Sequence, residues 1–149
     1  MSERKDLQKR SIAVDTGILI EILEDSNLGK KFYQEVLESP QFQKIYISPL
    51  TDTELKYIFC RLNGYKESKE LVTEFLKDFI ICSESELRDE AFRLKCMFSI
   101  SIADCYSLAV GILFSVPVYM KREEEIDQVI NEVLTIVKVI ILEDDDKDK

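Results

Sequence analysis

Carboxylates stand at four places where a predicted strand ends or a predicted helix begins. Asp15 ends the first apolar run, Glu54 lies near the start of the helix after the second strand, and Asp104 lies in the first turn of the most apolar helix. The run Glu123–Glu125 begins the helix after the fourth strand. Gathered carboxylates repel one another unless cations neutralise them, and such hard oxygen ligands favour Mg²⁺ or Mn²⁺. Two such ions about 4 Å apart can hold the attacking and leaving oxygens of a phosphodiester.

The chain contains no histidine, and this absence narrows the chemistry further. Mechanisms of the Ser-His-Asp and Cys-His kinds are excluded, so catalysis must use carboxylates, lysines, tyrosines, cysteines or hydroxyls. No pair of cysteines has metal-ligand spacing, and we expect all four to be buried free thiols: Cys60, Cys82, Cys96 and Cys105.

Each acid also has a purely structural interpretation. Asp15 could cap the helix that follows it, and the segments Thr51–Glu54 and Ser101–Asp104 both match a capping box, in which the acid accepts from backbone N–H groups. The run Glu123–Glu125 could be a solvent-exposed first turn that the helix dipole favours. Spacing alone leaves both interpretations open.

The predicted elements bring the four acids to one edge of a sheet. Hydrophobic periodicity predicts five strands, at 11–14, 44–47, 78–82, 116–120 and 136–142. It predicts helices between them, at 18–23, 29–38, 49–63, 66–77, 83–98, 102–113 and 123–134. Strands that alternate with helices predict an α/β domain with a mainly parallel central sheet flanked by helices. Such sheets carry their sites beyond the carboxyl ends of the strands.

Length, apolar runs and charge together predict the domain organisation of the protein, its location and its way of contacting nucleic acid. We expect a single domain over 1–142 and a disordered acidic tail over 143–149, in a chain of 149 residues. The longest apolar run, 107–117, is too short to cross a membrane, and 1–10 lacks an apolar signal core, so we expect a cytoplasmic protein. The net charge of −9 argues against a bulk electrostatic grip on nucleic acid. This charge does not argue against a nuclease in which bound metal ions contact the phosphate.

At these same acids the chain resembles PIN domains, and especially the small toxins of VapBC-type toxin–antitoxin pairs. Segment 11–20, SIAVDTGILI, resembles the opening strand of the family, whose terminal acid matches Asp15. Segment 47–55, ISPLTDTEL, resembles the second motif and matches its acid to Glu54. Segment 101–109, SIADCYSLA, resembles the third and matches Asp104. The resemblance extends over about 11–142, nearly the whole chain.

The resemblance implies a three-layer PIN-like fold and a metal-dependent endoribonuclease, the toxin of a toxin–antitoxin pair. It implies that Asp15, Glu54, Asp104 and Glu123 hold Mg²⁺ or Mn²⁺ and carry catalysis. It further implies an RNA substrate, a protein antitoxin and a homodimer. The chain departs from the family after the fourth strand, where a Thr/Ser-x-Asp motif is usual and MKREEE stands at 120–125. Glu123 is the best match for the fourth acid there, and Glu125 is the alternative.

Two other functions stay open at this stage. The chain could be an RNA-maturation nuclease of the same fold, although it has no CxxC pair and no added domain. The altered fourth motif also allows a catalytically weakened PIN-like binding subunit.

Several side chains near the acids also have two interpretations. Lys121 and Arg122 could hold a phosphate or balance local charge. For Lys56 we expect a solvent-exposed position rather than contact with substrate. Three tyrosines could stack on bases, but we expect core or half-buried packing for all of them: Tyr57, Tyr65 and Tyr106.

Overall fold

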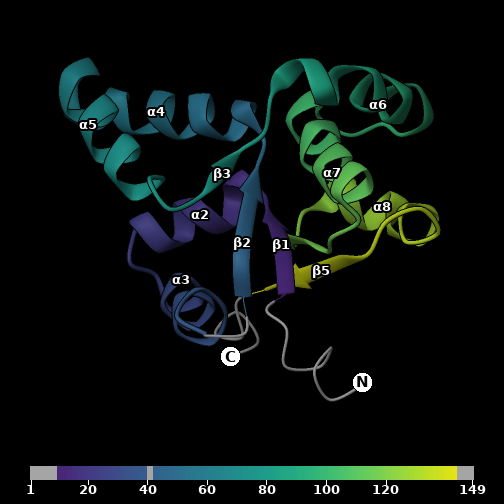
Figure 1. Cartoon of the computed structure of the whole chain (residues 1–149), viewed down its shortest axis with the longest axis horizontal. Helices are drawn as coiled ribbons and strands as arrows, with labels where there is room; N and C mark the ends of the chain where they lie inside the picture. The colour runs from purple at the N-terminus through teal and green to yellow at the C-terminus, as the bar shows by residue number, and fades with distance from the viewer. Residues whose placement is uncertain (1–9, 40–41, 144–149) are drawn as a thin grey trace.

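The structure of the chain is a computed structural model that describes residues 10–39 and 42–143 (Figure 1). Within these ranges the chain forms five strands: β1 (Arg10–Val14), β2 (Phe42–Ile47), β3 (Ile80–Ile81), β4 (Val118–Lys121) and β5 (Val139–Leu142). They are connected by helical segments: α2 (Thr16–Leu23), α3 (Asn27–Phe32), the π-helical η1 (Tyr33–Leu37), α4 (Pro49–Asn63), α5 (Tyr65–Phe75), α6 (Glu84–Met97), α7 (Ile102–Phe114) and α8 (Glu124–Val133). Apart from Glu143, the predicted acidic tail lies outside the described residues.

The strands form one sheet in the order β3-β2-β1-β4-β5, and every neighbouring pair is parallel. Figure 1 shows α2, α4 and α5 on one side of this sheet and α6, α7 and α8 on the other. Because parallel strands need a crossover between them, the chain passes through helices each time it returns to the sheet. The predicted α/β fold with a helix-flanked parallel sheet is therefore confirmed.

The central strand β1 divides its side chains between two hydrophobic clusters. Ile12 and Val14 pack with the helices α2 to α5, whereas Ala13 packs with α6, α7 and α8. Successive side chains of a strand point to opposite faces, so a strand in the middle of a covered sheet is apolar on both. This burial anchors the end of β1, where Asp15 follows directly.

Three predicted strands are shorter in the structure, for identifiable reasons. The predicted strand at 136–142 begins only at Val139, since the N–H groups of Ile136 and Val137 are bonded to the Val133 carbonyl at the end of α8. The predicted strand at 78–82 is reduced to Ile80–Ile81, because β3 lies at the sheet edge and pairs only with β2. The predicted strand at 116–120 begins only at Val118, since the N–H of Val116 is bonded to the Gly111 carbonyl at the end of α7. Pro117, which has no N–H, follows it.

The helix starts that matter for the acids are fixed by serines. Ser48 accepts from the Leu50 N–H at 3.0 Å, and Pro49 occupies the first helical position of α4, as predicted. Ser101 accepts from the Asp104 N–H at 3.0 Å and starts α7. These two caps set where Glu54 and Asp104 stand along their helices.

No single helix in the described ranges is long and apolar enough to cross a membrane; α6 and α7 pass such a test only as a pair, bent by 119° between them. The four cysteines are free thiols, as predicted, but their predicted burial is only partly right. Cys82 and Cys105 are buried, Cys60 is half-buried and Cys96 is exposed. Burial raises the pKa of the Cys82 and Cys105 thiols to about 11, so both stay protonated at neutral pH.

Candidate metal centre

Asp15 lies at the carboxyl end of β1 with only 4% of its surface exposed. It occupies the N-cap position of α2, but its side chain makes no capping hydrogen bond. Its carboxylate instead accepts from the Ser107 hydroxyl of α7 at 2.5 Å. The capping interpretation of Asp15 is therefore wrong, and its carboxylate is directed towards α7.

The pKa of Asp15 is raised from 3.8 to about 6. Burial is the main cause, because removing a carboxylate from water disfavours its charged form. The Ser107 hydrogen bond and the Thr16 N–H oppose this rise, and the charges of Glu123 and Glu54 add to it. Asp15 thus lies within electrostatic reach of two of the other predicted site acids.

Asp104, in the first turn of α7, is equally buried, with 4% of its surface exposed. Its backbone N–H is bonded to Ser101, but its Oδ2 atom is buried and has no hydrogen-bond partner. Its pKa is raised to about 7, first by burial and then by the charges of Asp15 and Glu123; the Ser101 hydroxyl opposes the rise, and Glu125 adds to it. A buried carboxylate oxygen without a partner costs free energy, and a cation would remove that cost.

Glu54 is held in place by the hydroxyl of Thr16, which also lies beside the hydroxyl of Thr51. Its Oε1 accepts from the Thr16 hydroxyl at 2.7 Å, and Thr16 and Thr51 lie 2.9 Å apart, hydroxyl to hydroxyl. Since α4 is capped by Ser48, Thr51 lies inside the helix, and the capping-box interpretation of Thr51–Glu54 is wrong. Thr16 directly follows Asp15, so this bond ties Glu54 to the end of β1.

The sequence predicts that the last helix begins at Glu123. In the structure α8 begins at Glu124, and Glu123 precedes it. It is the N-cap residue, with extended backbone (φ −140°) and no side-chain capping bond. Its pKa is raised by partial burial and by the charges of Glu125 and Glu54, while Lys121 opposes the rise. Both Glu123 and Glu125 raise the pKa of Asp104, so the structure keeps both as candidates for the fourth acid.

The donor set fits a hard divalent cation. The charges of Glu54 and Glu123 raise the pKa of Asp15, those of Asp15 and Glu123 raise the pKa of Asp104, and that of Glu54 raises the pKa of Glu123, so the four carboxylates lie in one region. The unpartnered Asp104 Oδ2 is the atom that most requires a cation. Among the described residues no three such acids stand already in metal-binding geometry, so the side chains must move to share an ion. Gly17 lies beside this region: a Cβ there would stand 3.3 Å from Lys121 Cβ and 3.8 Å from Glu123 Oε1.

The cations beside the site are already paired. Lys121 lies 3.5 Å from Glu21, and Arg122 is paired with Asp127 at 3.0 Å and with Glu143 at 2.6 Å. Of the two predicted roles for these residues, the structure favours the balancing of local charge.

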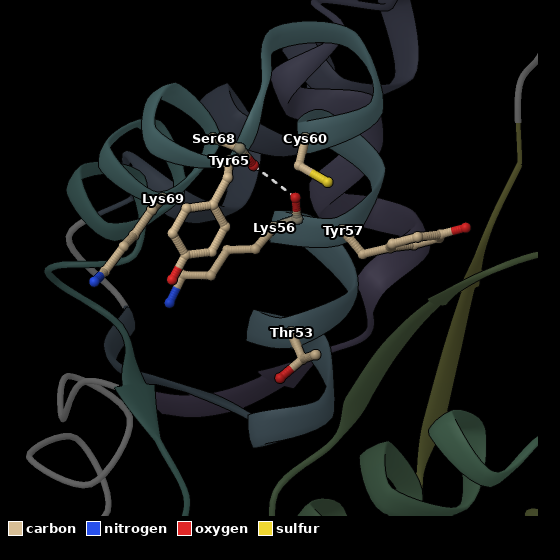
Figure 2. Close-up of a pocket in the computed structure, with 7 residues that line it drawn as sticks. All are labelled: Thr53, Lys56, Tyr57, Cys60, Tyr65, Ser68 and Lys69. Atoms are coloured by element: carbon tan, nitrogen blue, oxygen red, sulfur yellow. Dashed lines mark hydrogen bonds between the residues drawn. The ribbon is translucent and has the colours of Figure 1, made fainter.

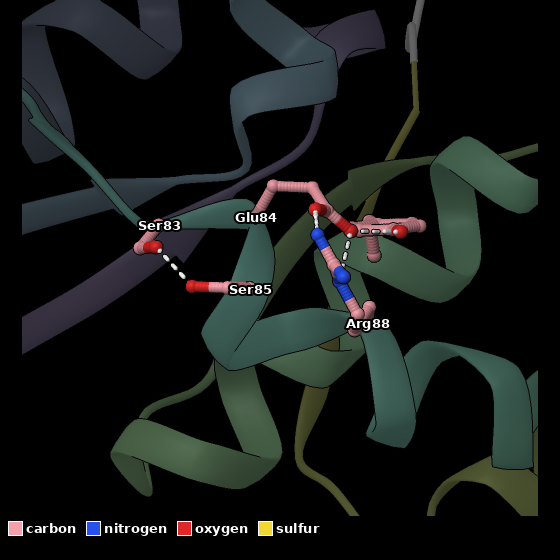
Figure 3. Close-up of polar contacts among 5 residues, drawn as sticks. Ser83, Glu84, Ser85 and Arg88 are labelled. Carbon is pink, nitrogen blue, oxygen red and sulfur yellow. Dashed lines mark hydrogen bonds and ion pairs between the residues drawn. The ribbon is translucent and has the colours of Figure 1, made fainter.

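The predicted burial of the tyrosines is wrong for two of the three. Tyr57 and Tyr65 are 59% and 77% exposed. Tyr106 is half-buried and donates to Glu84 at 2.8 Å, in a network in which Glu84 also accepts from Arg88 (Figure 3). Lys56, predicted to be exposed, is half-buried and pairs with Asp52 at 2.9 Å.

Sequence reasoning missed the hydroxyls that hold the acids. Ser107 lies three residues after Asp104, on a helix whose other buried members are mostly apolar. Residues three apart share a face of a helix, so a polar residue on that face could have been linked to the site. Thr16 offered no comparable signal, because its partner lies 38 positions away.

Three comparisons with known proteins bear on this arrangement. A model of the PIN domain family matches residues 12–135. No curated protein matches the chain by sequence. Among solved structures, VapBC-1 from nontypeable Haemophilus influenzae is similar with a TM-score of 0.66 at 12% identity, over 88% of this chain and 97% of that one.

Two further solved structures are also similar. VapBC2 from Rickettsia felis, bound to a DNA fragment from its promoter, has a TM-score of 0.62 at 14% identity, over 89% and 98% of the two chains. FitAcB from Neisseria gonorrhoeae has a TM-score of 0.56 at 19% identity, over 87% and 96%. At these identities the likeness shows a shared fold.

Proposed function

The chain belongs to the PIN-domain family, and from that membership we propose that it is a metal-dependent endoribonuclease that hydrolyses RNA phosphodiester bonds. The observation that carries the proposal is the pair of buried acids, Asp15 and Asp104. Both have pKa values raised to about 6 and 7, and Asp104 keeps an oxygen without a partner. Burial of two coupled carboxylates is costly in free energy, which favours a function that requires them.

In this proposal Asp15, Glu54, Asp104 and Glu123 hold Mg²⁺ or Mn²⁺, with Glu125 as the alternative fourth acid. A divalent ion there supplies charge stabilisation for a phosphoryl group and lowers the pKa of a water molecule, without any histidine. Ser107 holds the carboxylate of Asp15 through its hydrogen bond, and Thr16 holds that of Glu54. These hydroxyls limit the rotamers of both acids and so orient their oxygens.

We propose further that the protein is the toxin of a toxin–antitoxin pair and acts in the cytoplasm. The support is that the similar solved structures, at TM-scores above 0.5, are toxin–antitoxin complexes such as the one from Klebsiella pneumoniae (TM-score 0.59, 16% identity). A protein antitoxin and a second copy of the chain are the expected partners. Static light scattering of the purified chain should give the mass of a dimer, and a monomer at high concentration would contradict that part.

The test of the activity is cleavage of a mixed pool of cellular RNA. The wild-type chain should cut RNA with Mn²⁺ or Mg²⁺, stop when EDTA is added, and recover when excess metal is restored. Asp104→Asn should not cut under any of these conditions. Cleavage that continues in EDTA would contradict a metal-dependent mechanism.

A non-catalytic binding subunit is the second candidate, because no three acids of the described residues stand in metal-binding geometry. Calorimetric titration with Mn²⁺ separates the two. An enzyme should bind the ion in a saturable manner that Asp104→Asn weakens, whereas a binding subunit should show no such heat.

A further inference from the structure

The antiparallel helices α4 and α5 enclose a surface pocket of about 330 Å³ that no role described above uses (Figure 2). We call it the α4–α5 pocket; it is lined by Thr53, Lys56, Tyr57, Cys60, Tyr65, Ser68 and Lys69. Figure 2 shows Tyr65 and Lys69 on α5 beside Lys56, whereas Tyr57 points away from them along the other side of α4. The two tyrosines are among the most exposed aromatic side chains of the described residues.

The charge of this pocket is opposite to that of the chain. The protein carries a net charge of −9, yet the lining contains two lysines and no carboxylate. Lys56 is paired with Asp52, but Lys69 has no ion-pair partner within the described ranges. Arg61 adds a cation that lies over the Tyr57 ring at 5.9 Å from its centroid. The pocket and the adjoining side of α4 therefore offer aromatic faces and cations together.

The Ser68 hydroxyl inside the pocket already has a hydrogen-bond partner. The Ser68 hydroxyl donates to the Lys56 carbonyl at 2.6 Å and so joins α5 to α4. This bond keeps the two helices at a fixed separation, and the groups left to meet a ligand are the two phenol rings and the ammonium of Lys69. A preformed pocket of this kind can bind a ligand without the entropy cost of ordering its own backbone.

The position of the pocket on α4 links it to the proposed metal centre. Thr53 lines the pocket and Glu54 is the next residue. Tyr57 and Arg61 stand three and seven residues after Glu54, the spacing that repeats on one side of a helix. At about 1.5 Å per residue they lie roughly 4.5 and 10 Å further along the helix axis. An RNA chain with a phosphate at Glu54 would therefore contact Tyr57 next along the helix.

We propose that the α4–α5 pocket and the adjoining side of α4 form a subsite for single-stranded RNA. Tyr65 and Lys69 at the pocket, and Tyr57 and Arg61 on that side of α4, would stack on bases and contact the flanking phosphates. This inference rests on the proposed ribonuclease activity and assigns the surface that holds the substrate beside the carboxylates. Aromatic faces with nearby cations bind unpaired nucleotides with little regard to sequence, because every base has a π face. In an otherwise acidic chain, such a patch supplies the local attraction for RNA that the net charge does not.

The test measures binding and cleavage separately. In an Asp15→Asn background, which prevents cleavage, the anisotropy of a fluorescein-labelled single-stranded RNA of about a dozen nucleotides gives the dissociation constant. Tyr57→Ala and Tyr65→Ala should each weaken binding about five- to a hundredfold, and Tyr57→Phe should restore it. Lys69→Ala should also lower the dependence of binding on salt.

Matched controls come from elsewhere on the surface. Phe92→Ala removes an aromatic ring that is 69% exposed on α6, and Lys138→Ala removes an exposed cation at the other end of the sheet. Neither should change RNA affinity. With Asp15 intact, Tyr57→Ala should leave Mn²⁺ affinity by calorimetry equal to wild type, because the metal centre itself is untouched.

Three results would overturn the subsite, and they are distinguishable from failure of the proposed function. If the wild-type chain cuts RNA but the Tyr57→Ala and Tyr65→Ala variants bind it as tightly as their parent, only the subsite fails. If these variants keep their RNA affinity but turn a wild-type dimer into a monomer by light scattering, the surface is a self-association interface. If the wild-type chain neither binds nor cuts RNA, both proposals fail.

Discussion

The chain contains two kinds of carboxylate whose environments are opposite. Asp15 and Asp104 are buried beside other acids, and their pKa values are raised. Glu84 and Glu90 lie on α6, each beside an arginine one helical turn away, and their pKa values are lowered by the hydrogen bonds from Arg88 and Arg93. The same chemical group is thus destabilised in its charged form in one region and stabilised in the other.

The difference separates acids whose charged form the fold stabilises from acids whose charged form it destabilises. The α6 pairs lie at the surface, and such pairs contribute little to stability. The buried pair has no cation among the described residues to compensate it, so its free-energy cost is unrelieved within the chain itself. A group kept at a cost is a candidate for function, and the predictions below test whether the two regions behave as differently as this implies.

The largest expected contrast is in activity. Asp15→Asn should reduce metal-dependent RNA cleavage at least a hundredfold, since it removes a proposed metal ligand. The domain should stay folded, because the amide can still accept from Ser107 and no longer repels Asp104. Glu84→Gln should leave the rate unchanged. Cleavage rates and circular dichroism of the two variants check this, and unfolding of Asp15→Asn would instead indicate a structural role for Asp15.

The second contrast is in the pH dependence of stability of the metal-free protein. Folded Asp15 and Asp104 have pKa values above their unfolded value of 3.8, so between about pH 4 and pH 7 the folded state binds more protons. The free energy of unfolding should therefore fall as the pH rises through that window, by on the order of a few kcal/mol. Urea unfolding at about pH 5 and about pH 7.5 measures the change.

The control for this pH dependence is an Asp104→Asn variant, whose stability should depend less steeply on pH. Glu84 and Glu90 act in the opposite sense, because their lowered pKa values contribute stability that is lost only as the pH falls. Stability that rises between about pH 5 and pH 7.5 in EDTA would mean that the surface acids dominate.

A smaller effect concerns the fourth acid. Glu123→Gln should weaken Mn²⁺ binding by about tenfold, whereas Glu124→Gln should not, since Glu123 is the residue coupled to Glu54 and Asp104. Calorimetric titration measures both, and Glu125→Gln decides the alternative ligand. Unchanged binding in all three variants would leave a site of three protein acids.

The smallest contrast separates true helix caps from acids that only occupy a cap position. Ser101→Ala should lower the free energy of unfolding by about 1 kcal/mol, because Ser101 accepts from the Asp104 N–H. Glu123→Ala should lower it by less, since Glu123 makes no side-chain capping bond. Chemical unfolding of the two variants in EDTA compares them, and equal losses would show that Glu123 also stabilises the start of α8.

The sequence predicted the elements better than it predicted the state of single side chains. Serine caps, Pro49 and apolar periodicity act over a few neighbouring residues, so the order of strands and helices could be inferred from them. The exposure of Tyr57 and Tyr65 could not be inferred in this way, because α4 and α5 pack against the rest of the domain through other faces. The Ser107–Asp15 bond spans 92 positions, a distance over which local patterns carry no information.

The first strand of the chain, β1, is the middle strand of the sheet, and Ala13 pairs with Val118, roughly a hundred residues later. Pairing over such a separation is slow, and it cannot begin before the later strand has been synthesised. Asp15 and Glu123 flank this pairing, so they come together only once most of the chain has left the ribosome. For the proposed ribonuclease, this strand order means that the nascent chain has no assembled metal centre until β4 has been synthesised and paired with β1.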